Sequence, residues 1–145
     1  MGPLAPVSAG QIRRLKPQTT EMVAVAYADH SIAGCPPPER ILARAAEQGF
    51  GRILIDTFDK RGGSAMQHMG FGRLSDFSAA AQRLGLWWAR AGSIRLDDLG
   101  ELRTNLGTHG NFPDCIGVRG AICKEKRTGV LCPQQLGQWQ AKVNA

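Results

Sequence analysis

Residues 52–60 read RILIDTFDK, an apolar run that ends in two aspartates and a lysine. A short run of β-branched and other large apolar residues predicts a buried β-strand. Three further runs of this kind, at residues 22–28, 86–91 and 115–119, start at steps of about 30 residues, the length of one βα unit. Strands that are nearly continuous in apolar character are typical of parallel sheets. The four runs therefore predict a sheet of four parallel strands.

A helical pattern follows each of these runs. Three prolines at positions 36–38 suit the entry to a first helix, and apolar residues at three- and four-residue steps between positions 74 and 84 predict a second. Asp97 can cap a third helix, and Pro133 can open a fourth. The alternation of strands with helices places the chain in the α/β class.

A parallel sheet with crossover helices leaves two architectures open. A doubly wound sheet usually has a Gly-x-Gly-x-x-Gly turn after its first strand, but residues 27–30 read YADH. In a (β/α)₈ barrel the functional side chains follow the strand ends, as the polar residues do here, and eight units need about 200 residues or more. We therefore predict that residues 22–145 form a (βα)₄ half of a TIM-type (β/α)₈ barrel, and that residues 1–21 are a lead-in segment.

The composition is that of one globular domain with an excess of positive charge. The 145 residues are 43% hydrophobic, and 18 Lys and Arg stand against 12 Asp and Glu. No apolar stretch is long enough for a membrane span, and the start lacks a secretory pattern, so we expect a cytoplasmic protein without membrane contact. Only Lys124, Lys126 and Arg127 form a tight basic group, and no aromatic stacking motif lies beside it. We therefore expect no nucleic-acid partner.

Charged side chains follow the first two predicted strands. Asp29 comes after the first, Asp56 ends the second, and Lys60 follows four residues later. Strand alternation places Asp56 on the face opposite Ile53 and Ile55, and can turn Lys60 toward the same mouth. A lysine amine there can form a Schiff base or move protons with the help of a carboxylate. The spacing alone, however, fits an ordinary surface ion pair better.

Small residues follow the third and fourth predicted strands. Residues 91–93 read Ala-Gly-Ser, and residues 117–121 read Gly-Val-Arg-Gly-Ala. Small side chains let backbone N–H groups approach a phosphate, and barrels commonly bind phosphate after their last two strands. Tight turns with a solvated arginine fit the same residues equally well. The candidate phosphate-binding residues are Gly92, Ser93, Arg119, Gly120 and Ala121.

Three further patterns lead to predictions. The connection from Asp59 to Gly72 is rich in glycine and predicts a mobile lid over the strand ends, although a poorly ordered loop would have the same composition. The three histidines have no metal-type spacing, so no metal site is predicted. Cys115 and Cys123 are interpreted as small buried apolar residues.

Taken together, the strand ends resemble a known family. The segments that carry the resemblance are VAYAD at 25–29, IDT at 55–57 with KRG at 60–62, GL at 85–86, AGS at 91–93, and GVRGA at 117–121 with Cys123. In order and spacing they resemble the carboxyl-terminal half of (5-formylfuran-3-yl)methyl phosphate synthase. The resemblance runs from about Met22 to the end of the chain.

This resemblance implies a carbon-oxygen lyase of methanofuran biosynthesis with aldolase-like Schiff-base chemistry and no cofactor. The family condenses two molecules of glyceraldehyde 3-phosphate, so the implied partner is a small phosphorylated aldehyde. Asp56 and Lys60 match the family's acid–base pair, and the glycine-rich turns match phosphate-binding positions. Asp29 is expected as a further catalytic residue.

The chain also departs from the family. The family's Schiff-base lysine lies in an Asp-x-Lys motif after the second barrel strand, and another functional lysine comes from the fourth; neither motif occurs here. Lys16 precedes every predicted strand and is assigned neither role. We therefore expect half of an active site, inactive alone, that self-associates or pairs with a missing amino-terminal half. A non-catalytic phosphate-binding or assembly half-barrel is the alternative.

Overall fold

The computed structural model describes residues 20–125 and 128–145. The predicted lead-in segment therefore lies almost entirely outside the described residues, as do Lys126 and Arg127. The elements, in chain order, are β1 (Val23–Tyr27), α2 (His30–Ala33), α3 (Pro38–Glu47), β2 (Arg52–Asp56), α4 (Ala65–Arg83), β3 (Trp87–Arg90), α5 (Asp98–Leu106), η1 (Gly107–His109), β4 (Cys115–Ile116), η2 (Gly120–Ile122) and α6 (Pro133–Asn144).

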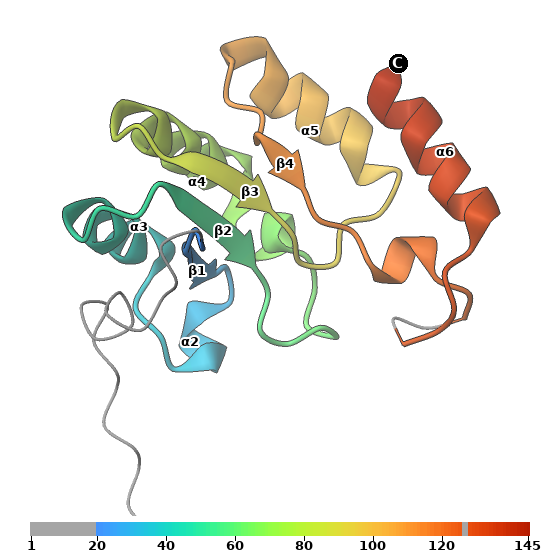
Figure 1. Ribbon diagram of the computed structural model, residues 1–145, viewed down its shortest axis with the longest axis horizontal. Helices are drawn as coiled ribbons and strands as arrows, with labels where there is room; N and C mark the ends of the chain where they lie inside the picture. Colours follow the sequence, from blue (N-terminus) through green and yellow to red (C-terminus); the bar gives the residue numbers. More distant parts are fainter. Residues whose placement is uncertain (1–19, 126–127) are drawn as a thin grey trace, which may run out of the picture.

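The four strands form one parallel sheet in the order β1-β2-β3-β4 (Figure 1). The predicted α/β class and the four parallel strands are thus confirmed. β4 is shorter than predicted, because pairing with β3 ends where the Gly117 amide donates to the Arg90 carbonyl at 2.8 Å. In the described part of the chain no helix is long and apolar enough to cross a membrane.

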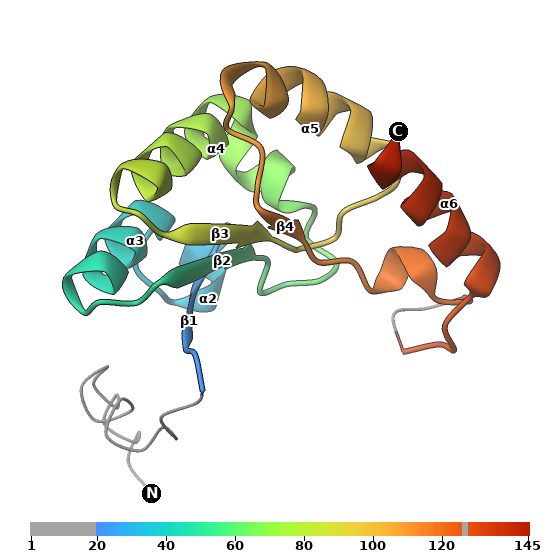
Figure 2. The ribbon, with the colours of Figure 1, turned by 45° about the horizontal axis from the view of Figure 1, so that its top comes forward.

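One face of the sheet carries the hydrophobic core. Ile53 and Ile55 of β2 and Trp88 of β3 are buried there, and Figure 2 shows α3, α4 and α5 along this side of the sheet. The Trp88 ring meets Phe77 of α4 edge-on, with ring centroids 5.8 Å apart. Ile53 and Ile55 lie on the same face, as predicted, because side chains two residues apart in a strand point to the same side.

The opposite face of the sheet is apolar but partly exposed. The strand register shows which side chains are neighbours on this face. It aligns Val23 with Arg52 and Trp87, and Val25 with Leu54. The two valines are each 44% exposed, and the Arg52 guanidinium stacks over the Trp87 ring at 4.8 Å. We call this surface the open face. Parallel sheets are normally covered on both faces, so the exposure of these two valines departs from the usual pattern.

The predicted lid over residues 59–72 is wrong in its second half. Helix α4 begins at Ala65, because Ser64 and Gln67 form a capping box in which each side chain accepts a hydrogen bond from the other's backbone N–H. The glycines that suggested a loop are accommodated by a kink at Gly70, whose φ is 75°. Met69, counted as part of the lid, is buried in the core.

Two smaller predictions are wrong, and one short helix was not predicted. Asp97 does not cap α5 with its side chain; instead the neighbouring Asp98 carboxylate accepts from the Arg95 amide at 2.8 Å. The short helix α2 was not predicted. Cys115 is exposed rather than buried, because β4 lies at the edge of the sheet. The predicted proline entries are confirmed, since α3 begins at Pro38 and α6 at Pro133.

Candidate active site

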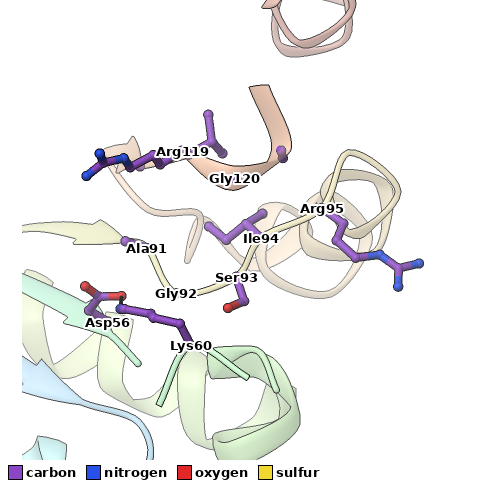
Figure 3. A pocket seen from close by; sticks show the side chains of 12 residues that line it. Asp56, Lys60, Ala91, Gly92, Ser93, Ile94, Arg95, Arg119 and Gly120 are labelled. Carbon is purple, nitrogen blue, oxygen red and sulfur yellow. Dashed lines mark hydrogen bonds and ion pairs between the residues drawn. The ribbon is translucent and has the colours of Figure 1, made fainter. Parts of the chain in front are cut away.

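A cavity of about 620 Å³ lies at the carboxyl ends of the strands. Its walls come from the end of β2 and the turn after it, from the turn after β3, and from the segment after β4 (Figure 3). Seven of the eight candidate residues from the sequence line it, and Asp29 does not. The cavity is lined by Asp56, Lys60, Ala91, Gly92, Ser93, Ile94, Arg95, Gly117, Val118, Arg119, Gly120 and Ala121.

Asp56 and Lys60 form an ion pair in the floor of this cavity. The Lys60 Nζ lies 2.7 Å from Asp56 Oδ1 and also donates to the Thr57 carbonyl. Both side chains are about three-quarters buried, with 28% and 26% of their surface exposed. Figure 3 shows Lys60 extending toward Asp56, whereas the Arg95 guanidinium points away from the pair. The ammonium therefore sits between two oxygen acceptors and faces the cavity.

The turn after β3 is built in a conformation that needs glycine. Gly92 has a φ of 87° and Ser93 a φ of 56°, both in the left-handed region. A Cβ at position 92 would lie only 2.8 Å from the Thr57 nitrogen. The two turns are thus packed against each other, and this contact fixes Ser93 relative to the turn that carries Lys60.

Several backbone N–H groups of the glycine-rich turns that line the cavity have no hydrogen-bond acceptor in the described part of the chain. Within residues 20–125 and 128–145, the N–H groups of Gly92, Ser93, Gly120 and Ala121 have no hydrogen-bond acceptor. Arg119 adds a cation to the same wall. Backbone N–H groups without an acceptor, together with an arginine, are donors that phosphate groups can use in proteins. In the described segments, no three His, Cys, Asp or Glu side chains form a metal-binding cluster.

Replacing Gly92 by alanine is expected to lower the free energy of unfolding by about 2–4 kcal/mol, because the new methyl group adds left-handed strain and overpacks Thr57. Gly137→Ala in α6 is the matched control. A Cβ there meets no atom within 4 Å, and alanine stabilises a helix interior by about 0.5–1 kcal/mol. Urea denaturation followed by circular dichroism measures both; equal midpoints for Gly92→Ala and the native chain would contradict the packing described.

Asp29 lies beside this site rather than in it. Its carboxylate is 4% exposed and accepts hydrogen bonds from the backbone N–H groups of Phe58 and Asp59, at 2.7 and 2.8 Å. Burial of the carboxyl group raises its pKa, but these backbone donors and the nearby His68 outweigh burial, so the pKa of Asp29 lies below its usual range. The carboxylate therefore stays charged at neutral pH.

Two arginines near the cavity were not singled out from the sequence. Arg95 lines the wall, and its place directly after the Ala-Gly-Ser turn was the available signal. Arg90 precedes this turn and is fully buried, with no hydrogen-bond partner for its side-chain nitrogens in the described residues. Burial lowers the pKa of Arg90 to about 10, against the opposing effect of Asp98. No sequence pattern distinguishes such a buried arginine from an exposed one.

Comparison with known proteins agrees with the motifs at the strand ends. A sequence model of the family described as 4-HFC-P synthase matches residues 5–140. The (5-formylfuran-3-yl)methyl phosphate synthase of Methanosarcina barkeri is 34% identical over 127 residues, which cover 88% of this chain and 52% of that protein. The synthase of the same name from Methanosarcina acetivorans is 35% identical over 111 residues, covering 76% of this chain and 45% of that protein. The chain thus spans about half the length of these relatives.

Proposed function

The chain belongs to the 4-HFC-P synthase family, and from this we propose that it is the acid–base and phosphate-binding half of a synthase that forms (5-formylfuran-3-yl)methyl phosphate for methanofuran-type cofactors. One observation carries the proposal: a single cavity brings the Lys60–Asp56 pair together with free N–H groups of two glycine-rich turns. The substrate that fits both features is a small phosphorylated aldehyde, and glyceraldehyde 3-phosphate is the one we propose.

The proposed chemistry joins two molecules of glyceraldehyde 3-phosphate, with loss of one phosphate and two water molecules. The carbon–carbon bond would form by aldol attack, with the electron pair supplied by a carbanion equivalent that a Schiff base elsewhere in the enzyme stabilises. Lys60 would donate a proton to the oxygen that becomes an alkoxide or departs as water. Asp56 would hold the ammonium in place, accept the proton that the substrate carbon loses in the elimination, and pass that proton to the neutral Lys60 amine. The 2.7 Å ion pair supports this role, because it connects the two proton carriers directly.

The phosphate of the substrate would bind between the two glycine-rich turns. Gly92 and Ser93 line the cavity from the turn after β3, and Arg119, Gly120 and Ala121 line it from the segment after β4. Bound there, a three-carbon phosphate would present its carbonyl end toward Lys60, which lines the same cavity.

We further propose that the open face is one half of a TIM-type barrel interior. The cover would be a second (βα)₄ body, whose edge strands pair with the free edges of β1 and β4 and whose apolar side chains pack on Val25, Leu54 and Trp87. The length of the relatives supports this cover, since about half of each lies outside the match. The same body would bring the Schiff-base lysine that this chain lacks.

The test is to co-express the chain with the part of the Methanosarcina barkeri synthase outside the matched 127 residues and to measure furan product from glyceraldehyde 3-phosphate. We expect no product from the chain alone and product from the pair. Turnover by the purified chain alone, at the rate of the intact relative, would refute the proposal that it is half of an enzyme. A pair that co-purifies but makes no product would refute the acid–base role.

A non-catalytic phosphate-binding or assembly half-barrel is the second candidate. It is favoured by the one observation that the glycine-rich turns line the cavity whereas the family's Asp-x-Lys motif does not occur in this sequence. Borohydride trapping separates the candidates. A reduced adduct of glyceraldehyde 3-phosphate, formed on the Schiff-base lysine of the added half or on Lys60 itself, identifies an enzyme with a reactive amine. Phosphate binding with no adduct on either chain of the pair identifies the binding module.

A further inference from the structure

Asp29 occupies the position of a helix cap but does not act as one. It precedes α2, yet its side chain makes no capping hydrogen bond to that helix. Both carboxylate oxygens instead reach across to the neighbouring strand's turn, where Oδ1 accepts from the Phe58 amide and Oδ2 from the Asp59 amide. A buried carboxylate that uses both oxygens on two consecutive N–H groups makes strong, charge-assisted hydrogen bonds.

The turn held in this way is the one that carries Lys60. After Asp59 the chain forms a tight turn. The Asp59 side chain accepts a hydrogen bond from the Arg61 amide, and the Asp59 backbone carbonyl accepts one from the Gly62 amide. Lys60 then folds back to Asp56 at the end of β2. The turn between the end of β2 and Lys60 is therefore anchored by Asp29, which follows β1 and lies outside the cavity.

We propose that Asp29 is a positioning residue, whose carboxylate holds the turn after β2 so that the Lys60 ammonium stays on Asp56. This inference rests on the proposed function only for its catalytic consequence; the positioning itself is a property of the chain. It replaces the catalytic role expected from the sequence, because Asp29 does not line the cavity and its oxygens are engaged by backbone donors.

The test compares the reactivity of two lysines in one protein. Reductive methylation with formaldehyde and cyanoborohydride, read by peptide mass spectrometry, gives the labelling rate of Lys60 relative to the exposed Lys142. In Asp29→Asn we expect this ratio to rise at least about threefold, because the carboxylate's charge-assisted bonds to the turn are lost. Asp76→Asn, an exposed aspartate of α4, is the matched control and should leave the ratio unchanged.

Two measurements keep the result decisive if Asp29→Asn folds poorly. In the native chain, hydrogen exchange at the Phe58 amide should be slow even though the Phe58 residue is 55% exposed. Exchange there at the rate of an unstructured peptide overturns the proposal without any variant. In Asp29→Glu, which keeps the charge, the labelling ratio should lie closer to native than in Asp29→Asn.

A purely structural role would change the stability of the whole chain and the labelling of both lysines, but not their ratio. An unchanged ratio in folded Asp29→Asn overturns the positioning role. Failure of the synthase proposal would look different, since the paired enzyme would then make no product while the Lys60 ratio still responded to Asp29.

Discussion

Replacing Lys60 by methionine is expected to lower turnover of glyceraldehyde 3-phosphate, in the chain paired with a closing half, by about 10²–10⁴-fold. This is the usual contribution of a positioned general acid or base. Methionine keeps an unbranched apolar stem but removes the ammonium that bridges the Asp56 carboxylate and the Thr57 carbonyl. Steady-state formation of the furan product measures the loss.

The matched control for this variant is Lys142→Met, which removes an exposed lysine of α6 and should leave turnover unchanged. Asp56→Asn should cost a similar factor to Lys60→Met. The double variant should be little slower than either single one, because groups that act as a unit are not additive. Turnover of Lys60→Met within twofold of native would exclude Lys60 from the chemistry.

Replacing Trp88 by alanine is expected to lower the free energy of unfolding by about 3–5 kcal/mol, the usual cost of truncating a large buried aromatic residue. Trp88 is 1% exposed, and it fills the space between β3 and α4 against Phe77. Alanine would leave a cavity in the layer that joins the sheet to its helices. Guanidinium denaturation followed by circular dichroism measures the change.

The neighbouring Trp87 provides the control, because it differs from Trp88 in the face it occupies. Its ring lies on the open face, where it stacks with Arg52. Because Trp87 is only partly buried, Trp87→Ala should cost about 1–2 kcal/mol, the range of a partly desolvated cation–π contact. Equal losses for the two tryptophans would contradict the assignment of one face as core and the other as open.

The sheet and much of the site could be predicted because both follow from alternation along β2. Ile53 and Ile55 identify the core face, and the same parity puts Asp56 on the other face, where the Lys60 contact is found. Parallel order then brings the strand ends to one edge, so the Gly92 and Gly120 turns had to lie near that contact.

What could not be predicted depends on contacts between distant residues. The Asp29 carboxylate bonds to amides 29 and 30 positions away, and no local pattern at residue 29 shows where its side chain turns. The start of α4 was missed for a different reason. Its capping box stands among glycines, whose preference for loops outweighed the short Ser64–Gln67 signal.

The sheet order β1-β2-β3-β4 is also the order of synthesis. Each βα unit can therefore dock on the one before it as the chain leaves the ribosome, without waiting for a distant segment. The same arrangement makes the last unit the weakest point, because β4 contributes only two residues to the ladder. Under a mechanical load applied at the carboxyl terminus, β4 and α6 should detach first and the β1–β2–β3 body should resist longest.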